Sequence, residues 1–122
     1  MKFLMLIKVA NSPDYEAGNP PPEQLNSAMG ELMEEWSKAG VMLSAAGLRP
    51  TSEGTRVRLN GGSVTFLDGP FTEAKEVIGG FFILEVESRA AVMDMTRRFV
   101  ELHQRVLGDD FQLECELREV EA

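Results

Sequence analysis

The stretch GGFFILEV, residues 79–86, decides how this 122-residue chain folds. Successive side chains of a β-strand point to opposite faces, and in this stretch both faces carry large apolar side chains. The stretch KFLMLIKV, residues 2–9, has the same property. Because a strand that is apolar on both faces lies inside a sheet covered on both sides, we predict that these two strands are the central pair of one sheet.

Apolar residues at helical spacing predict two helices. The first runs from Glu23 to Ala39, and Trp36 lies near the end of its apolar stripe. We expect the Trp36 ring to pack on the sheet and its N–H to face a polar partner. The second helix starts after Ser88, which is a favourable N-cap residue, and runs to Leu107.

Period-two alternation and turn residues predict the remaining strands. A short edge strand follows the first helix, a hairpin turns at Asn60-Gly61-Gly62, and a last strand is apolar on one face only. The strands after the first one are predicted at Val41–Ala46, Thr55–Leu59, Ser63–Leu67, Gly79–Glu87 and Phe111–Val120.

The order of these elements predicts an α+β fold, a ferredoxin-like βαββαβ sandwich with an inserted β-hairpin. Its antiparallel sheet has the order 4-1-3-2, with both helices on one face. This order places the first strand and the strand after the hairpin in the middle, as their two apolar faces require. A chain of 122 residues forms one domain, residues 1–122.

The two helices of such a sandwich leave the other face of the sheet uncovered. Leu4 and Leu6 would lie on that face, together with either the Phe81/Ile83 pair or the Phe82/Leu84 pair. Monomeric proteins rarely expose a large apolar patch, and a two-fold dimer is the commonest way to bury one. We therefore expect a homodimer whose sheets pack face to face.

Composition argues against several classes of function. The net charge of −8 disfavours nucleic acids, which are bound by basic surfaces, and it disfavours anionic membranes. No apolar run is long enough to span a bilayer. The N-terminal stretch lacks the small-residue cleavage site of a signal peptide, so we expect a cytoplasmic protein.

The chain has one cysteine, Cys115, and one histidine, His103. No cluster has the spacing of metal ligands, so we expect neither a metal nor a cofactor. Cys115 alternates with leucines on the apolar face of the last strand and is predicted to be a core residue. His103 lies beside the apolar stripe of the second helix, which indicates a structural role.

The run Asp68-Gly69-Pro70-Phe71 ends the hairpin. Asp and Gly are turn residues, and Pro70 fixes its own φ and restricts the residue before it. Gly69 lets another backbone or a ligand come close, and Phe71 can anchor the loop by burying its ring. The Asp68 carboxylate then either accepts hydrogen bonds from neighbouring backbone N–H groups or acts in a binding or catalytic site.

This run, with TEAKE at residues 72–76 and the strand that follows, resembles the signature of the YCII-related family in its DGPF-motif branch. The resemblance implies a dimeric α/β barrel, in which two sheets enclose a cavity, and it makes Asp68 a candidate general acid or base. It also implies a functional link to an extracytoplasmic-function sigma factor. Some members pair the aspartate with a histidine near the first helix, whereas residues 23–29, EQLNSAM, contain none.

Two hypotheses for the function remain open. The first is a non-catalytic small-molecule-binding or regulatory dimer with its ligand in a cavity between the sheets. The second is an isomerase- or lyase-like enzyme that transfers protons on a small organic acid, with Asp68 as the acid or base. The candidate ligand-binding residues are Gly69, Pro70, Phe71, Lys75 and Lys8.

Overall fold

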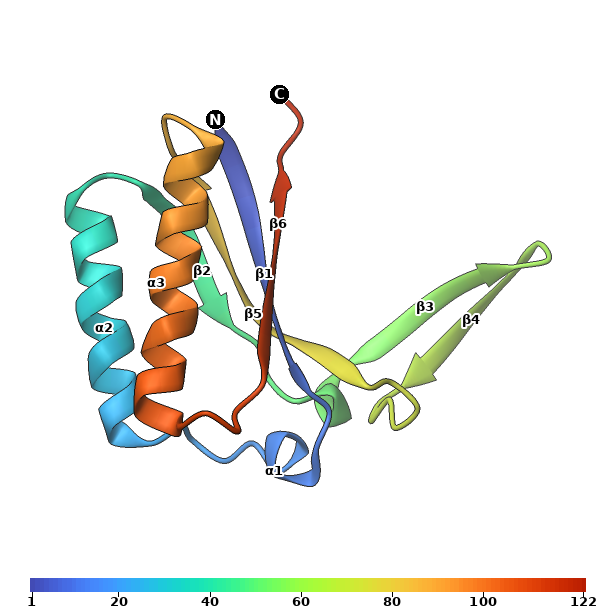
Figure 1. Cartoon of the computed structure of the whole chain (residues 1–122). Coiled ribbons are helices and arrows are strands. Elements are labelled where there is room, and N and C mark those ends of the chain that lie inside the picture. Colours follow the sequence, from blue (N-terminus) through green and yellow to red (C-terminus); the bar gives the residue numbers. More distant parts are fainter.

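The computed structural model describes the whole chain, residues 1–122, and shows an α+β protein with a four-stranded and a two-stranded sheet, both antiparallel (Figure 1). None of its helices combines the length and the apolar character needed to cross a membrane. In chain order the elements are β1 (Lys2–Ala10), α1 (Pro13–Glu16), α2 (Glu23–Lys38), β2 (Met42–Gly47), a short 3-10 turn η1 (Thr51–Glu53), β3 (Thr55–Asn60), β4 (Ser63–Asp68), β5 (Glu76–Glu85), α3 (Arg89–Leu107) and β6 (Leu113–Glu119).

β1 and β5 are the central strands of the main sheet, as the sequence predicts. The strand order is β2-β5-β1-β6, and every neighbouring pair is antiparallel. This is the order of a ferredoxin-like sandwich, with β2 and β6 at the edges. The predicted helix bounds agree with α2 and α3 to within one residue at each end.

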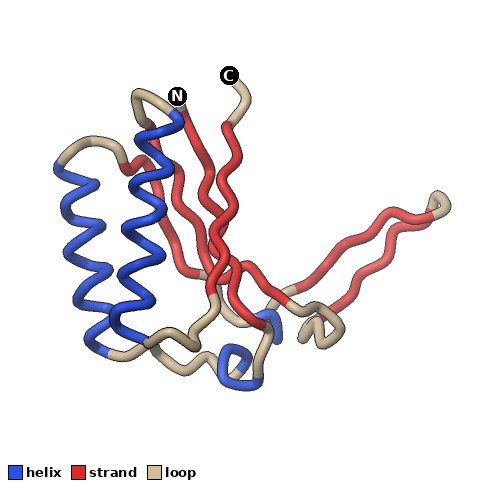
Figure 2. Tube along the Cα trace, in the orientation of Figure 1, coloured by secondary structure: helices blue, strands red, loops and turns tan.

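One layer of helices covers one face of this sheet. Figure 2 shows α2 and α3 side by side along the sheet, on the side away from β3 and β4. The Phe82 ring lies at the centre of their packing, edge-on to Trp36 and to Phe99, with ring centroids 5.4 Å apart in both pairs. The buried core consists of Phe3, Met5, Leu25, Leu32, Trp36, Phe82, Leu84, Val86, Val92, Phe99 and Leu102.

The structure decides which apolar side chains of β5 face the helices. Phe82 and Leu84 belong to the core, so the alternation of side chains places the residues beside them on the opposite face. Phe81 and Ile83 therefore face away from the helices, and so do their cross-strand partners on β1. We call these four partly buried residues the open-face stripe: Leu4, Leu6, Phe81 and Ile83.

A pair of glycines bends β5 where it approaches β2. The pairing of β1 with β5 skips Gly79, which makes a β-bulge. A Cβ on Gly80 would lie 2.8 Å from the carbonyl oxygen of Ala46, so only glycine fits this close pairing. The predicted strand start at Gly79 was wrong, because the glycines lie inside the strand, which begins at Glu76.

A short helix, α1, interrupts the loop that the sequence predicts between residues 10 and 22. Its N-cap is Ser12, whose hydroxyl oxygen accepts a hydrogen bond from the N–H of Tyr15 at 3.1 Å. Pro13 occupies the first helical turn, where its missing N–H is not needed. The sequence did not predict this helix because one turn is too short to show a helical period.

The predicted hairpin forms a sheet of its own. β3 pairs with β4, and the turn between them contains Gly61 and Gly62, both at positive φ. The hairpin projects from one end of the main sheet on the side opposite to the helices (Figure 1). We call this hairpin, residues 55–68, the arm.

The packing makes a prediction about Trp36, whose ring is only 2% exposed. The expectation of a polar partner for its N–H was wrong: Nε1 is buried without a hydrogen bond, because apolar side chains such as Phe82 surround the ring.

Trp36→Ala should lower the free energy of unfolding by about 3–5 kcal/mol. Trp36→Phe keeps an aromatic ring and removes the unpartnered N–H, so it should lower it by less than about 1.5 kcal/mol. Urea unfolding measures both, and equal losses would contradict the assigned packing.

Candidate functional site

The Asp68–Phe71 loop is packed against the 3-10 turn η1. The N–H of Gly69 donates to the carbonyl oxygen of Gly54 at 2.9 Å, and the N–H of Phe71 donates to the Thr51 hydroxyl at 3.4 Å. The peptide bond between Gly69 and Pro70 is cis. Phe71 is only 7% exposed, so it anchors the loop as its position in the run suggests.

Gly69 is required by this packing. A Cβ on Gly69 would lie 1.7 Å from the carbonyl oxygen of Thr51, far inside van der Waals contact. The close approach that the sequence indicates at Gly69 is therefore made by the backbone of the same chain.

Two side chains from the β1–α2 segment join the same loop. Asn11 donates through Nδ2 to the carbonyl oxygens of Phe71 and Ala74, at 2.9 and 2.8 Å. The Glu16 carboxylate accepts hydrogen bonds from the Thr51 hydroxyl and, at 2.9 Å, from the N–H of Ser52. We call this hydrogen-bonded unit the junction; it consists of Asn11, Glu16, Thr51–Gly54 and Asp68–Lys75.

Asp68 lies at the foot of the arm, with an exposed side chain. Its Oδ1 accepts a hydrogen bond from the Thr55 hydroxyl at 2.9 Å, and no backbone N–H donates to its carboxylate. The turn after Asp68 is thus held by Gly69 and Phe71, while one Asp68 oxygen faces solvent without a protein partner.

The other predicted binding residues lie in two separate places. Lys75 belongs to the junction through its carbonyl oxygen, which accepts from the N–H of Asn11 at 3.0 Å, and it is exposed. Lys8 lies on β1 next to β6, where its Nζ is 2.6 Å from Glu116 and 3.7 Å from Glu114. The hydrogen bond with Glu116 raises the pKa of Lys8 and lowers the pKa of Glu116. The Lys8 charge is therefore already matched within the chain.

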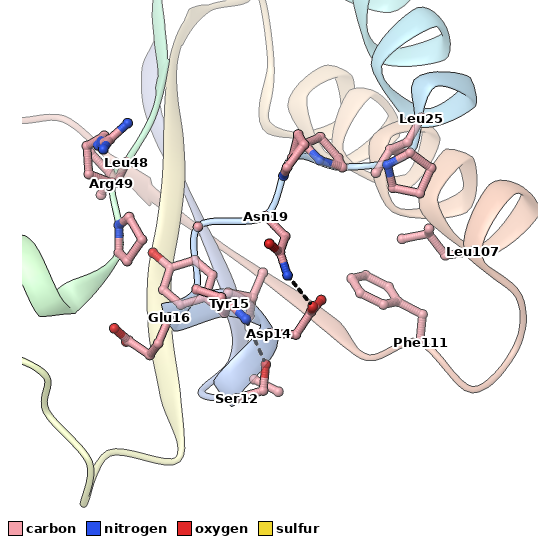
Figure 3. A pocket seen from close by; sticks show the side chains of 18 of the residues that line it. Ser12, Asp14, Tyr15, Glu16, Asn19, Leu25, Leu48, Arg49, Leu107 and Phe111 are labelled. Carbon is pink, nitrogen blue, oxygen red and sulfur yellow. Dashed lines mark hydrogen bonds between the residues drawn. The ribbon is translucent and has the colours of Figure 1, made fainter.

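A cavity of about 1110 Å³ opens at the end of the main sheet beside α1. In Figure 3 Tyr15 and Asn19 lie between Leu48 and Arg49 on one side and Phe111 on the other. None of the residues predicted for the site lines this pocket. The lining residues are Val9, Ala10, Ser12, Asp14–Pro22, Leu25, Leu48–Pro50, Ser52, Glu53, Leu107 and Asp110–Gln112.

Carboxylates outnumber cations in the pocket. Its only basic residue is Arg49, whose guanidinium is 3.1 Å from the Glu53 carboxylate. Asp14 accepts a hydrogen bond from the Asn19 amide at 2.9 Å, drawn in Figure 3. Burial raises the pKa of Tyr15, so its hydroxyl stays protonated at neutral pH, and it donates a long hydrogen bond, 3.5 Å, to the carbonyl oxygen of Ile78.

His103 and Cys115 have the structural roles that the sequence indicates. His103 is 7% exposed, its Nδ1 is 2.8 Å from the carbonyl oxygen of Phe99, and its ring stacks on Phe111 in the pocket wall. Burial lowers the pKa of His103, which favours the neutral ring. Burial also raises the pKa of Cys115 to about 11, so its thiol is protonated and a poor nucleophile at neutral pH.

Sequence reasoning missed the pocket because its walls come from three loops that are far apart in the chain. One signal was available: Tyr15 is the only tyrosine of the chain and lies in a loop of small, polar and proline residues. An aromatic side chain with a polar tip in such a loop often contributes to a binding surface.

These features define a small α+β protein of ferredoxin-like arrangement, with a loop junction and an open pocket at one end of its sheet. Residues 1–101 match the YCII-related domain, which is most of the chain, and the protein belongs to the YCII-related family. It is also similar to an uncharacterized protein of Rhizobium meliloti (strain 1021), with 28% identity over 75 residues. That alignment covers 62% of this chain and 60% of the relative, so it spans less than two thirds of the relative's length.

The junction predicts opposite effects for two Gly→Ala substitutions. Gly69→Ala forces a methyl group onto the Thr51 carbonyl and should lower the free energy of unfolding by about 3 kcal/mol. Gly30→Ala is the control: Gly30 lies in α2 with no atom within 4 Å of its ideal Cβ, so it should raise stability by about 0.5–1 kcal/mol. Urea unfolding compares the two, and a stable Gly69→Ala variant would show that the loop does not pack on η1.

Proposed function

We propose that this protein is a non-catalytic small-molecule-binding protein that works as a homodimer. The pocket is the observation that carries the proposal. Its volume of about 1110 Å³ is slightly above the range of about 300–1,000 Å³ that is usual for small-molecule sites. Its wall combines the Tyr15 and Phe111 rings with a few converging polar groups, which is the composition of sites that hold and orient small ligands.

The charge of the pocket indicates the class of ligand. Asp14, Glu16, Glu53 and Asp110 line it, and the one arginine is already paired with a carboxylate. An organic anion would meet like charge and find no free cation there. A small organic cation suits the acidic rim and can also lie on the aromatic rings. An uncharged aromatic molecule is the alternative ligand of this proposal.

The open-face stripe supports dimerisation through the main sheet. Its members form two cross-strand pairs, Leu4 with Ile83 and Leu6 with Phe81, on the face that lies away from the helices. A contiguous apolar patch of this kind marks an interface with another protein. A two-fold pair of these faces removes both stripes from water. It also produces the dimeric α/β barrel that the family resemblance implies, with a cavity between the sheets.

Charged residues border the stripe along β6. Lys8 and Arg118 both contact the Glu116 carboxylate, at 2.6 and 3.3 Å. An apolar centre with a polar, charged rim is the usual anatomy of a protein interface. The run Asp68–Phe71 further supports a place for this chain in the DGPF-motif branch of the family.

The pocket predicts discrimination between matched ligands of opposite charge. Phenethylamine should raise the melting temperature of the protein, and phenylacetate, its acidic counterpart, should not. A ligand present at one hundred times its Kd stabilises the folded protein by about 2.7 kcal/mol. Phe111→Ala removes part of the pocket wall and should reduce the response to the amine. Met93→Ala, a change at an exposed residue of α3 outside the pocket, should not. Further matched pairs of amines and acids extend the test. The assigned ligand class would be overturned if the protein bound both members of each pair equally well, or bound the acids more tightly.

Asp68 supports a second candidate function. Its carboxylate accepts only the Thr55 hydroxyl and does not hold the turn. A carboxylate with an unoccupied oxygen can accept or deliver a proton. In this alternative the protein is an isomerase- or lyase-like enzyme acting on a small organic acid, with Asp68 as the acid or base.

Asp68→Asn separates the two functions. The substitution keeps the size of the side chain and affects one exposed hydrogen bond, so the free energy of unfolding should change by no more than about 0.5 kcal/mol. A binding protein should keep its ligand response in this variant, whereas an enzyme that uses Asp68 should lose turnover. Glu73→Gln, at an exposed acid of the same loop, is the control for the loss of one negative charge. A large loss of stability in Asp68→Asn alone would make Asp68 a structural residue of the junction.

A further inference from the structure

One face of the arm carries four apolar side chains beyond its foot, and these side chains are in water. Its cross-strand pairs are Val57 with Phe66 and Leu59 with Val64. Side chains of such pairs lie on the same face of a hairpin. The exposed fractions of the four side chains are 60% for Val57, 73% for Phe66, 78% for Leu59 and 61% for Val64.

This exposure is not explained by the chain itself. Neither strand of the arm pairs with the main sheet, and an isolated two-stranded hairpin is at best marginally stable in water. Four apolar side chains at this exposure make a patch of a few hundred Å², comparable to the largest patch on a typical monomer, about 300–600 Å². Such a patch is expected to be covered in the working protein.

The foot of the arm is held firmly by the junction. The Arg56 guanidinium lies over the buried Phe71 ring, 3.8 Å from its centroid. Thr55 bonds Asp68 across the last pair of the hairpin. Because the direction of the arm is set before any partner binds, docking it loses little conformational entropy.

We propose that the arm is a clasp that packs its apolar face on a second copy of this chain, beside the partner's open-face stripe. The inference rests on the homodimer of the proposed function and adds a second contact to it. The direction of the arm supports a second copy, because the arm projects on the side of the main sheet opposite to the helices (Figure 1). That is also the side of the open-face stripe.

The charge of the arm also favours a second copy. The arm carries Arg56 and Arg58 and no acid before its last residue, whereas the whole chain has a net charge of −8. Arg58 makes no ion pair within its own chain. Arg58 pairs across the strands with Thr65, so it lies on the face of the arm opposite to the apolar one, and its charge acts at longer range and not through a contact on the apolar face. Two acidic bodies repel each other, and an arm with positive charge reduces that repulsion.

The size of the patch supports the same arrangement. A standard interface takes about 800 Å² from each partner, which is more than the arm alone offers. The arm and the open-face stripe together come closer to this area, and a two-fold dimer uses each of them twice. The clasp therefore extends the sheet-to-sheet contact and does not replace it.

The experiment compares four full-length proteins by sedimentation velocity and light scattering over a range of concentrations. They are the wild type, Phe66→Glu on the apolar face of the arm, Thr65→Glu on its other face, and Leu6→Glu in the open-face stripe. The wild type should have twice the chain mass of 13.5 kDa. Phe66→Glu should raise the dimer dissociation constant by about a hundredfold, since the change enters a two-fold dimer twice and a buried aromatic anchor is worth about tenfold or more. Thr65→Glu, the matched control, should change it by no more than about twofold.

A fluorescence reporter checks the clasp without disrupting it. In Phe66→Trp, the added tryptophan emission should shift to shorter wavelength as the concentration rises and the dimer forms. In Thr65→Trp the emission should not depend on concentration. Trp36 is 2% exposed and contributes a constant background in both variants.

The outcomes separate the clasp from the proposed dimer. A wild type that is monomeric at all concentrations overturns both the clasp and the homodimer. If such a monomer binds neutral lipid vesicles through Phe66, the apolar face of the arm serves a membrane and the clasp is overturned as well. A dimer that Leu6→Glu disrupts and Phe66→Glu does not overturns the clasp and keeps the sheet-to-sheet dimer. A dimer that Phe66→Glu disrupts and Leu6→Glu does not overturns the sheet-to-sheet contact and, with it, the clasp as an extension of that contact.

Discussion

The pairing of β1 with β5 is the constraint on which the rest of this protein depends. Both strands are apolar on both faces, so their pairing creates two surfaces that must leave water. On one face α2 and α3 cover the sheet, with Phe82 between Trp36 and Phe99. On the other face the chain supplies no helix to cover the open-face stripe (Figure 2).

The junction links the conspicuous sequence motif to the rest of the fold. Glu16 and Ser52 bond each other in the junction and also line the pocket. Phe71 is buried in the same unit and carries the Arg56 guanidinium at the foot of the arm. The Asp68–Phe71 run therefore positions two other parts of the molecule, the pocket wall and the arm. Its glycine and phenylalanine are explained by packing, while the Asp68 carboxylate accepts only the Thr55 hydroxyl and does not hold the turn.

Periodicity made most of the fold predictable. The pocket has no periodic signal and could not be predicted. The helices and the central strands repeat apolar residues at fixed intervals, and those intervals follow directly from backbone geometry. The pocket is lined by loops around Tyr15, Arg49 and Phe111, which have no period and are far apart in the chain. The turn α1 was missed for the same reason. Lys8 was predicted as a binding residue because it ends a central strand, and only the register of β6 shows that Glu116 accompanies it.

The sequence by itself determined the order of the elements, the two central strands and the presence of an uncovered apolar face, because these follow from local side-chain alternation. It could not decide whether Phe81 or Phe82 faces the helices, since alternation defines two faces without saying which one is covered. It could not show that Gly69 approaches the Thr51 carbonyl, or that the arm stands free of the main sheet. Only the tertiary structure decided these points, because each depends on groups that are distant along the chain and come together when the β1–β5 pair forms.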